Sequence, residues 1–243
     1  MKVVHNATDL PAEEEYYDYI VVGGGTAGCP LAATLSEKHS VLVLERGNAP
    51  KSHPNVLNVA GFFANLMEED SGDTPAQRFT SEDGVANVRG RVLGGTSMIN
   101  AGFFSRADPA YFGSNPGTEW DMEAVEKAYH WVEESLVTRP EGLAVWQSAV
   151  REALLEAGVG PDNGFSLDHK IGTKFSGSTF EKLGRRHGAV ELLNKGNFRN
   201  LRVAIQATVE KIIFSTNIAS SMYIYNSSSY LFIYFFRFSI IAN

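Results

Sequence analysis

Three glycines and one acid are spaced in a way that suits the binding of a dinucleotide. Gly23, Gly25 and Gly28 follow a short β-forming run, and Glu45 ends the next apolar run. In such a motif the first glycine permits a tight turn, the second lets the backbone approach a pyrophosphate, and the third allows a helix to pack closely on a strand. The amides and dipole at the start of that helix attract the pyrophosphate. The carboxylate of Glu45 is placed to accept hydrogen bonds from ribose hydroxyls, so these residues predict an adenine-dinucleotide site.

The acid at position 45 also narrows the choice of dinucleotide. It disfavours a bound 2′-phosphate, so FAD or NAD fits better than NADP. The positive charge of Arg46, which follows directly, weakens that preference. A plain βαβ turn is the alternative interpretation of the glycines, but it gives the acid no role.

The elements that must position these residues occur in the expected order. Residues 18–22 predict a strand, residues 30–38 a helix and residues 41–44 a second strand. This succession is typical of a βαβ unit. We therefore expect an α/β fold built on a Rossmann-like, doubly wound sheet.

A second glycine-rich stretch spans residues 90–103. Its glycines, at positions 90, 94, 95 and 102, surround the small hydroxyl residues Thr96 and Ser97. Such backbone can pass close to a large ligand, and its exposed amides can form an anion-binding nest. A structural turn is the alternative interpretation. An NAD dehydrogenase fits poorly, because this second stretch would have no role in it.

Composition limits the classes of partner. The chain has 243 residues, a net charge of −7 and no cluster of Lys and Arg, so we expect no binding to nucleic acid. The single cysteine, Cys29, excludes an internal disulfide, and we interpret it as a buried packing residue. No Cys/His spacing resembles a zinc site, so no metal is expected. Residues 1–17 contain no apolar h-region of a signal peptide, which leaves the compartment open.

The middle of the chain is read as loops and amphipathic helices. Residues 49–87 predict a long loop with short apolar pieces, and residues 160–179 predict another. Residues 120–137, with Asp121 as N-cap, and residues 145–157 predict helices. Three tryptophans of this section are expected in the core: Trp120, Trp131 and Trp146.

The last part of the chain changes character. A short helix at residues 189–194 is followed by β-forming runs at 201–205 and 207–214. From residue 212 to 243 the only charged side chain is that of Arg237. The apolar run at 231–236 is shorter than the roughly 20 residues that a membrane span needs. We interpret residues 215–243 as a premature, non-homologous end, with a single-pass anchor as the weaker alternative.

The two glycine motifs together resemble those of the glucose–methanol–choline (GMC) family of FAD flavoproteins. The closest likeness is in Gly90-Arg91-x-Leu93-Gly94-Gly95-Thr96-Ser97-x-Ile99-Asn100, with Phe104 following. Three further runs, at residues 28–36, 165–169 and 191–196, look like the plant (R)-mandelonitrile lyase branch. The resemblance covers residues 16–214. It implies an FAD-binding domain in two segments, 1–112 and 200–214, and an incomplete helical and substrate-domain part at 113–199.

The resemblance also implies roles for individual residues. Thr26 and Ala27 would touch the pyrophosphate, and Glu45 and Arg46 the adenosine half of FAD. The linker and flavin would be met by a longer set: Val92, Thr96, Asn100, Ala101, Gly102 and Phe103. The backbone of Val209 would meet the adenine.

The chemistry implied by the likeness to the (R)-mandelonitrile lyase branch is cleavage of a cyanohydrin to an aldehyde and HCN. Oxidation of CH–OH donors by FAD and a non-catalytic FAD-binding fragment are the alternatives. The family's acid–base histidine lies near the C-terminus, and none of the six histidines here matches it, so we expect no catalytic residue in this chain. The expected partner is a small alcohol or cyanohydrin, the expected state is a monomer without a membrane partner, and the resemblance allows a secretory route.

Overall fold

The computed structural model describes residues 4–6, 17–114, 119–215, 218–226 and 229–242. The chain forms two compact units, of which the first joins Met1–Ala101 to Gly184–Asn243 and the second is Gly102–Leu183. The boundaries expected at residues 112 and 199 divide FAD-binding segments from the substrate-domain part, and this functional division stays a prediction. Much of residues 1–17, where the absence of a signal peptide was predicted, lies outside the described residues.

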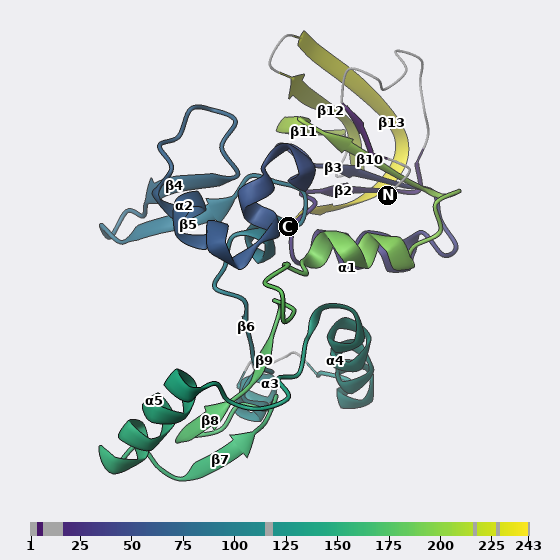
Figure 1. Cartoon of the computed structure of the whole chain (residues 1–243). Helices are drawn as coiled ribbons and strands as arrows, with labels where there is room; N and C mark the ends of the chain where they lie inside the picture. Colours follow the sequence, from purple (N-terminus) through teal and green to yellow (C-terminus); the bar gives the residue numbers. More distant parts are fainter. Residues whose placement is uncertain (1–3, 7–16, 115–118, 216–217, 227–228, 243) are drawn as a thin grey trace. The chain divides into compact units, whose positions relative to one another are not determined.

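The first unit is built on a seven-stranded sheet (Figure 1). Its strands, in spatial order, are β1 (Val4–Asn6), β10 (Leu201–Ile205), β3 (Val41–Leu44), β2 (Tyr19–Val22), β13 (Ser229–Ala242), β12 (Ile218–Asn226) and β11 (Thr208–Ser215). The first five run parallel, and β13, β12 and β11 form an antiparallel meander. The predicted β2–helix–β3 unit is thus the centre of a mainly parallel sheet.

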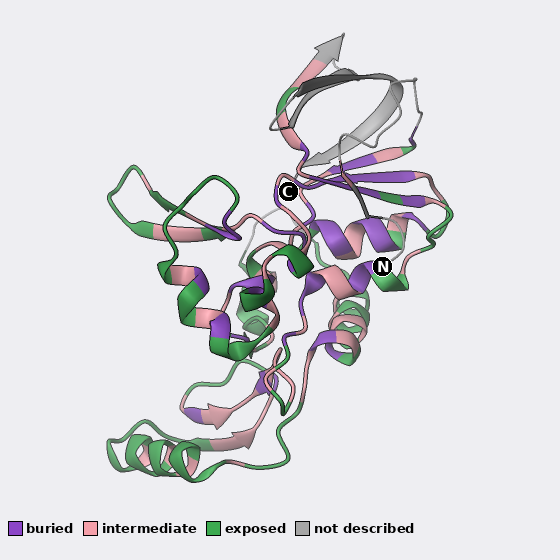
Figure 2. Cartoon of the chain, turned by 45° about the horizontal axis from the view of Figure 1, so that its top comes forward, coloured by how far each residue is buried: buried purple, intermediate pink, exposed green. Residues whose placement is uncertain are grey.

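The core lies on both faces of the central strands, which explains their continuous apolar sequences. All four residues of β3 are buried. On one face, α1 (Gly28–Leu35) packs beside the 3₁₀ helix η6 (Ala189–Lys195). On the other, Ile20, Leu42 and Leu44 pack with residues of β11 such as Ile212. Buried residues accordingly gather in the sheet and α1 in Figure 2.

Residues 49–90 are more regular than the predicted loop. They form η2 (Pro50–Ser52), η3 (Pro54–Leu57), η4 (Val59–Gly61), α2 (Phe62–Met67) and the hairpin of β4 (Ala76–Thr80) with β5 (Ala86–Gly90). Both hairpin strands carry polar side chains and are largely exposed, which hid them from a search for apolar runs. The hairpin leads directly into the second glycine motif.

The second unit contains the two predicted amphipathic helices. They are α4 (Met122–Leu136), whose first turn is capped by the Asp121 carboxylate, and α5 (Val145–Glu156). The smaller elements are β6 (Phe103–Phe104), α3 (Pro109–Gly113), β7 (Asp162–Phe165), β8 (Thr173–Phe175) and β9 (Gly177–Ser178). Residues 160–179, predicted as loop, therefore hold three short strands.

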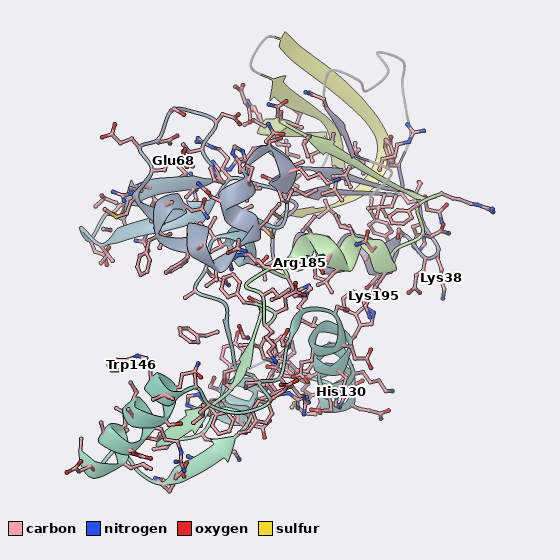
Figure 3. All side chains as sticks on the ribbon, viewed as in Figure 1. Lys38, Glu68, His130, Trp146, Arg185 and Lys195 are labelled. Atoms are coloured by element: carbon pink, nitrogen blue, oxygen red, sulfur yellow. The ribbon has the colours of Figure 1, made fainter. Side chains whose placement is uncertain are left out.

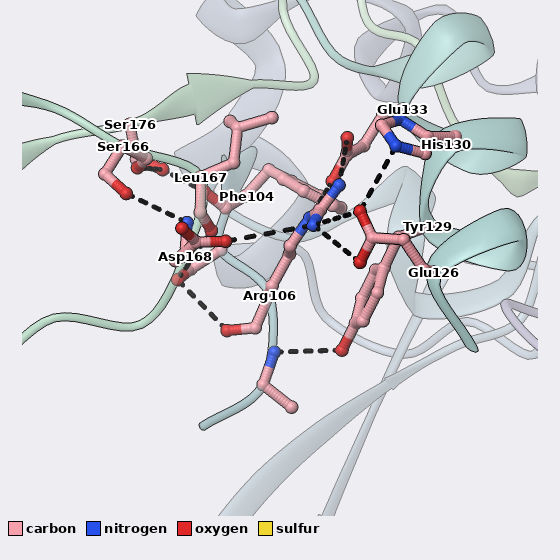
Figure 4. Close-up of polar contacts among 12 residues, drawn as sticks. Phe104, Arg106, Glu126, Tyr129, His130, Glu133, Ser166, Leu167, Asp168 and Ser176 are labelled. Carbon is pink, nitrogen blue, oxygen red and sulfur yellow. Dashed lines mark hydrogen bonds and ion pairs between the residues drawn. The ribbon is translucent and has the colours of Figure 1, made fainter. Parts of the chain in front are cut away.

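An arginine holds α4 to the chain that follows β6 (Figure 4). Arg106 donates from Nε and Nη2 to the two carboxylate oxygens of Glu133, at 2.6 and 3.0 Å, and from Nη1 to Glu126 at 2.8 Å. Its guanidinium also lies 5.0 Å from the ring centroid of Tyr129. The hydrogen bonds to Glu133, and after them those to Glu126, raise the pKa of Arg106. Paired charges of this geometry stabilise the second unit.

The expectation that the tryptophans lie in the core is wrong for two of them. Trp146 is 77% exposed and Trp120 42% exposed. In Figure 3 the Trp146 side chain projects from the ribbon of α5. The half-buried residues of α5 are Ser148, Arg151 and Leu155, and the helix contacts β8.

Residues beyond Ser215 continue the sheet as β12 and β13. Ser239, Ile240, Ile241 and Ala242 pair in parallel with the four residues of β2. The sequence analysis did not predict these strands, because the sequence shows no period-2 alternation here. The interpretation of residues 215–243 as a non-homologous end stays a prediction. None of the helices in the described part of the chain has the length and apolar character that crossing a bilayer requires.

Candidate functional site

A pocket of about 540 Å³ lies in the first unit at the end of the β2 and β3 strands. Nine of the predicted site residues line it: Gly23, Gly25, Thr26, Ala27, Glu45, Arg46, Gly95, Thr96 and Val209. Parallel strands present ligands at their carboxyl ends, which is where these residues are found. The structure thus brings together the turn, the acid and the second motif.

The turn after β2 depends on glycine for its shape. Gly23 has a φ of +98°, a conformation that other residues rarely adopt, and its amide donates to Leu44 O at 2.8 Å. A Cβ on Gly28 would lie 1.9 Å from Gly23 O. Gly28 does not line the pocket; it lets α1 start directly behind the turn, as the sequence predicted.

The two glycine motifs touch through their main chains. The amide of Gly94 donates to Gly24 O at 2.6 Å. Gly95 has a φ of +60°, and a Cβ there would lie 2.7 Å from the Cα of Gly25. Because neither loop carries a side chain at this contact, both expose backbone to the same pocket.

Glu45 is the buried acid of the pocket. Only 5% of it is exposed, and its two carboxylate oxygens accept hydrogen bonds from the amides of Gly24, at 2.9 Å, and Gly47, at 2.8 Å. Burial raises its pKa, while those two amides and the Arg46 charge oppose the rise. Each oxygen has further lone pairs, so the carboxylate can hold the turn and still accept from a ligand hydroxyl.

Arg46 and Val209 form the outer wall of the pocket. The Arg46 guanidinium donates to Gln77 Oε1 at 2.7 Å, and burial lowers its pKa. Val209 is brought in because residues 204–207 bond along the end of β3: Glu45 N donates to Ala204 O and Ala207 N to Glu45 O, each at 2.9 Å. The return of the chain through β10 to β11 therefore closes the pocket.

Five other predicted site residues lie outside this pocket. Val92 is fully buried in a cluster with Met98 and Ile99. Asn100 accepts a hydrogen bond from Arg186, and Ala101 is exposed. Gly102 and Phe103 belong to the second unit, where β6 pairs with β9 and Phe103 is 89% exposed. Their predicted contacts with a flavin stay predictions.

Five residues of the pocket were not predicted as site residues: Val22, Leu44, Gly90, Ala207 and Thr208. Val22 and Leu44 end their strands directly before Gly23 and Glu45, so their positions could have been inferred from the motif. Ala207 and Thr208 precede Val209, and only the resemblance pointed to that segment. Gly90 opens the second motif, and a Cβ there would lie 2.3 Å from the carbonyl carbon of Gly95.

Comparison with known proteins identifies the family of the chain. The profile described as GMC oxidoreductase matches residues 17–229. The chain belongs to the GMC oxidoreductase family. The resemblance based on the two glycine motifs is confirmed, and the family match runs past residue 214, where we expected the likeness to stop.

Curated members of the GMC family match closely over part of their length. Sinalpyl alcohol oxidase Nec3 from Nesocodon mauritianus is 60% identical over 221 residues, which are 90% of this chain and 39% of that protein. (R)-mandelonitrile lyase 1 from Prunus serotina is 59% identical over 215 residues, which are 88% of this chain and 38% of that protein. The chain therefore spans 38–39% of the length of these relatives.

Solved structures share the fold. A formate oxidase from Aspergillus oryzae, in which FAD modification was studied, superposes with a TM-score of 0.72 at 18% identity, covering 95% of this chain and 45% of its own. Pyridoxine 4-oxidase from Mesorbium loti gives 0.71 at 23% identity, covering 92% and 48%. These likenesses confirm the predicted α/β fold. The GMC family implies FAD as the class of cofactor.

Proposed function

We propose that this chain binds FAD through the pocket of its first unit. The main support is that three features line one pocket: the Gly23–Ala27 turn, the Gly95–Thr96 backbone and the buried Glu45 carboxylate. The turn and the start of α1 supply amides for the pyrophosphate, and Glu45 supplies an acceptor for a ribose hydroxyl. The adenine then lies toward Val209.

The properties of the pocket support a dinucleotide. Its volume of about 540 Å³ is within the range of about 300–1,000 Å³ that is common for ligand pockets. Glycine backbone at Gly23 and Gly95 leaves the amides open to an anion, and the acid is held by two backbone hydrogen bonds. Within the first unit, residues 97–101 continue from the pocket wall, and the flavin half is proposed to lie along Asn100 and Ala101.

For the whole protein, we propose cyanohydrin cleavage to an aldehyde and HCN, supported by the mandelonitrile lyase relatives. Oxidation of an alcohol is the second candidate, and it is favoured specifically by the 60% identical sinalpyl alcohol oxidase. FAD supplies hydride acceptance in an oxidation. The pocket binds the adenosine diphosphate part in both cases, so it does not separate the two activities.

We further propose that this chain binds FAD without catalysing either reaction. Both reactions need a base at the substrate hydroxyl, and a missing base costs about two to four powers of ten in rate. His169 is 3.9 Å from Asp108 and half-exposed on the second unit, and no histidine whose side chain the structure describes lines the pocket. The FAD-loaded chain is therefore expected to cleave mandelonitrile no faster than free FAD, and turnover above that background would refute this point.

Titration with three ligands tests the binding site. FAD and ADP-ribose carry the adenosine diphosphate half, whereas FMN lacks it, so FAD and ADP-ribose should bind and FMN should bind at least about tenfold more weakly. Glu45→Gln should weaken FAD by about tenfold, because the amide cannot accept from both backbone N–H groups. Glu37→Gln, an exposed position on the turn after α1, is the matched control. A folded chain that binds no FAD, or binds FMN equally well, would contradict the proposal.

A further inference from the structure

Arg186 is a fully buried arginine that grips the second glycine motif. In the sequence it follows the second unit and precedes η6; it belongs to the first unit and is 1% exposed. Its Nη1 donates to Asn100 Oδ1 at 2.8 Å and to Ser97 O at 3.3 Å, and its Nη2 donates to Asn100 O at 2.6 Å. Nε donates to Val56 O at 3.0 Å.

A guanidinium is costly to bury, so its hydrogen bonds must offset the loss of hydration. Burial lowers the pKa of Arg186 to about 10, which leaves it charged at neutral pH. Hydrogen bonds from a charged donor are stronger than those between neutral groups, and the planar fork holds its acceptors in fixed directions. Asn100 is therefore held at its main chain and side chain by one rigid group.

The segment that Arg186 holds begins in the pocket wall. Gly95 and Thr96 line the pocket, they open η5 (Gly95–Met98), and the amide of Asn100 donates to Thr96 O at 3.0 Å. A Cβ on Gly95 would lie 2.7 Å from the Cα of Gly25, in the turn proposed to bind the pyrophosphate. Residues 97–100 thus lead away from the place proposed for the pyrophosphate, whereas Glu45 marks the adenosine side.

We propose that Arg186 is a positioning residue for the cofactor: by fixing Asn100 it holds the chain that leaves the pocket wall, so that Ser97 and Asn100 keep one position toward the flavin half of FAD. The inference rests on the proposed binding of FAD. It assigns Arg186 an effect on the flavin half that the adenosine diphosphate half does not share.

Two ligands separate this role from general stabilisation. Arg186→Lys keeps the charge but loses the fork, and it should raise the Kd for FAD by at least about tenfold while changing the Kd for ADP-ribose by less than about threefold. A variant that was only partly folded would lose affinity for both ligands by the same factor. Arg185→Lys is the control, because Arg185 is exposed and its described partner is Glu191 at 3.6 Å (Figure 3).

Asn100→Ala supplies the second test, which also decides the matter if Arg186→Lys fails to fold. It should lower the affinity for FAD but not for ADP-ribose. The double variant, Arg186→Lys with Asn100→Ala, should have a Kd for FAD no higher than that of the weaker-binding single variant, because both substitutions act through one contact. Equal losses for FAD and ADP-ribose, or FAD binding by Arg186→Lys at the wild-type level, would overturn the inference alone. A wild-type chain that binds no FAD would refute the proposed function and, with it, this inference.

Discussion

Replacing Gly95 by alanine perturbs the contact between the two glycine motifs at one atom. Gly95 has a φ of +60°, and the added Cβ would lie 2.7 Å from Gly25 Cα and 3.4 Å from Thr26 N. Contacts shorter than 3.0 Å do not occur at real Cβ atoms, so one of the two main chains must move. Both chains belong to the proposed pyrophosphate site, and the substitution acts there without removing a polar group.

The magnitude follows from two costs. An alanine at positive φ costs about 1–2 kcal/mol relative to glycine. Moving the loops apart also weakens the 2.6 Å hydrogen bond from Gly94 N to Gly24 O, worth about 1 kcal/mol. Gly95→Ala should therefore lower the free energy of unfolding by about 2–3 kcal/mol and weaken FAD by about 10- to 100-fold.

Urea unfolding and FAD titration measure the two effects separately. Gly142→Ala is the matched control, because a Cβ at Gly142 meets no atom within 4 Å and its φ is outside the positive range; it should change stability by less than about 1 kcal/mol. The reasoning is refuted if Gly95→Ala unfolds and binds FAD as the control does. Lost stability with unchanged FAD affinity would show that the contact serves the fold but not the site.

Two further predictions concern buried titratable groups. Burial raises the pKa of Glu45 above the 4.5 of a free side chain, so the stability that its protonated form contributes is present below pH 4.5 and is lost as pH rises through the folded-state pKa. Urea unfolding from pH 4 to 7 should therefore show the wild-type chain losing stability relative to Glu45→Gln. Parallel stability profiles of the two chains would contradict this prediction. Burial raises the pKa of the Cys29 thiol to about 12, so this single cysteine should react with a thiol reagent at pH 8 only after the chain is unfolded. Rapid labelling of the native chain would contradict this prediction, because it would show that the reagent reaches the thiol in the folded state.

The β2–α1–β3 unit and its glycines could be predicted because each residue there answers a local requirement. Gly23 needs positive φ, Gly28 lies against a carbonyl, and Glu45 follows a fully buried strand. These requirements recur in any chain that folds this way, so spacing alone reveals them. The predicted acid also proved to hold the turn itself, a second role that spacing does not show.

Other features depend on contacts between distant residues and left no local signal. Arg186 meets Asn100 and Val56, which are far away in sequence, and nothing near position 186 distinguishes it from the exposed Arg185. The β4–β5 hairpin has polar, exposed strands, so its pairing is a matter of main-chain hydrogen bonds. Trp146 was expected to be buried because aromatic residues usually are. It is 77% exposed, although α5 itself contacts β8.

The last residues of the chain take a place in the sheet beyond the end of the family match. Residues 239–242 pair with β2 through main-chain groups, whereas the family match ends at residue 229. A parallel ladder requires residues that tolerate extended backbone, and the β-branched and aromatic residues of the tail meet that need whatever their origin. Without a neighbour, β2 would present an unpaired row of N–H and C=O groups. Ala242 pairs with Val22, which lines the pocket and precedes Gly23. The main chain of residues 239–242 therefore pairs with β2 next to the turn that we propose for the pyrophosphate.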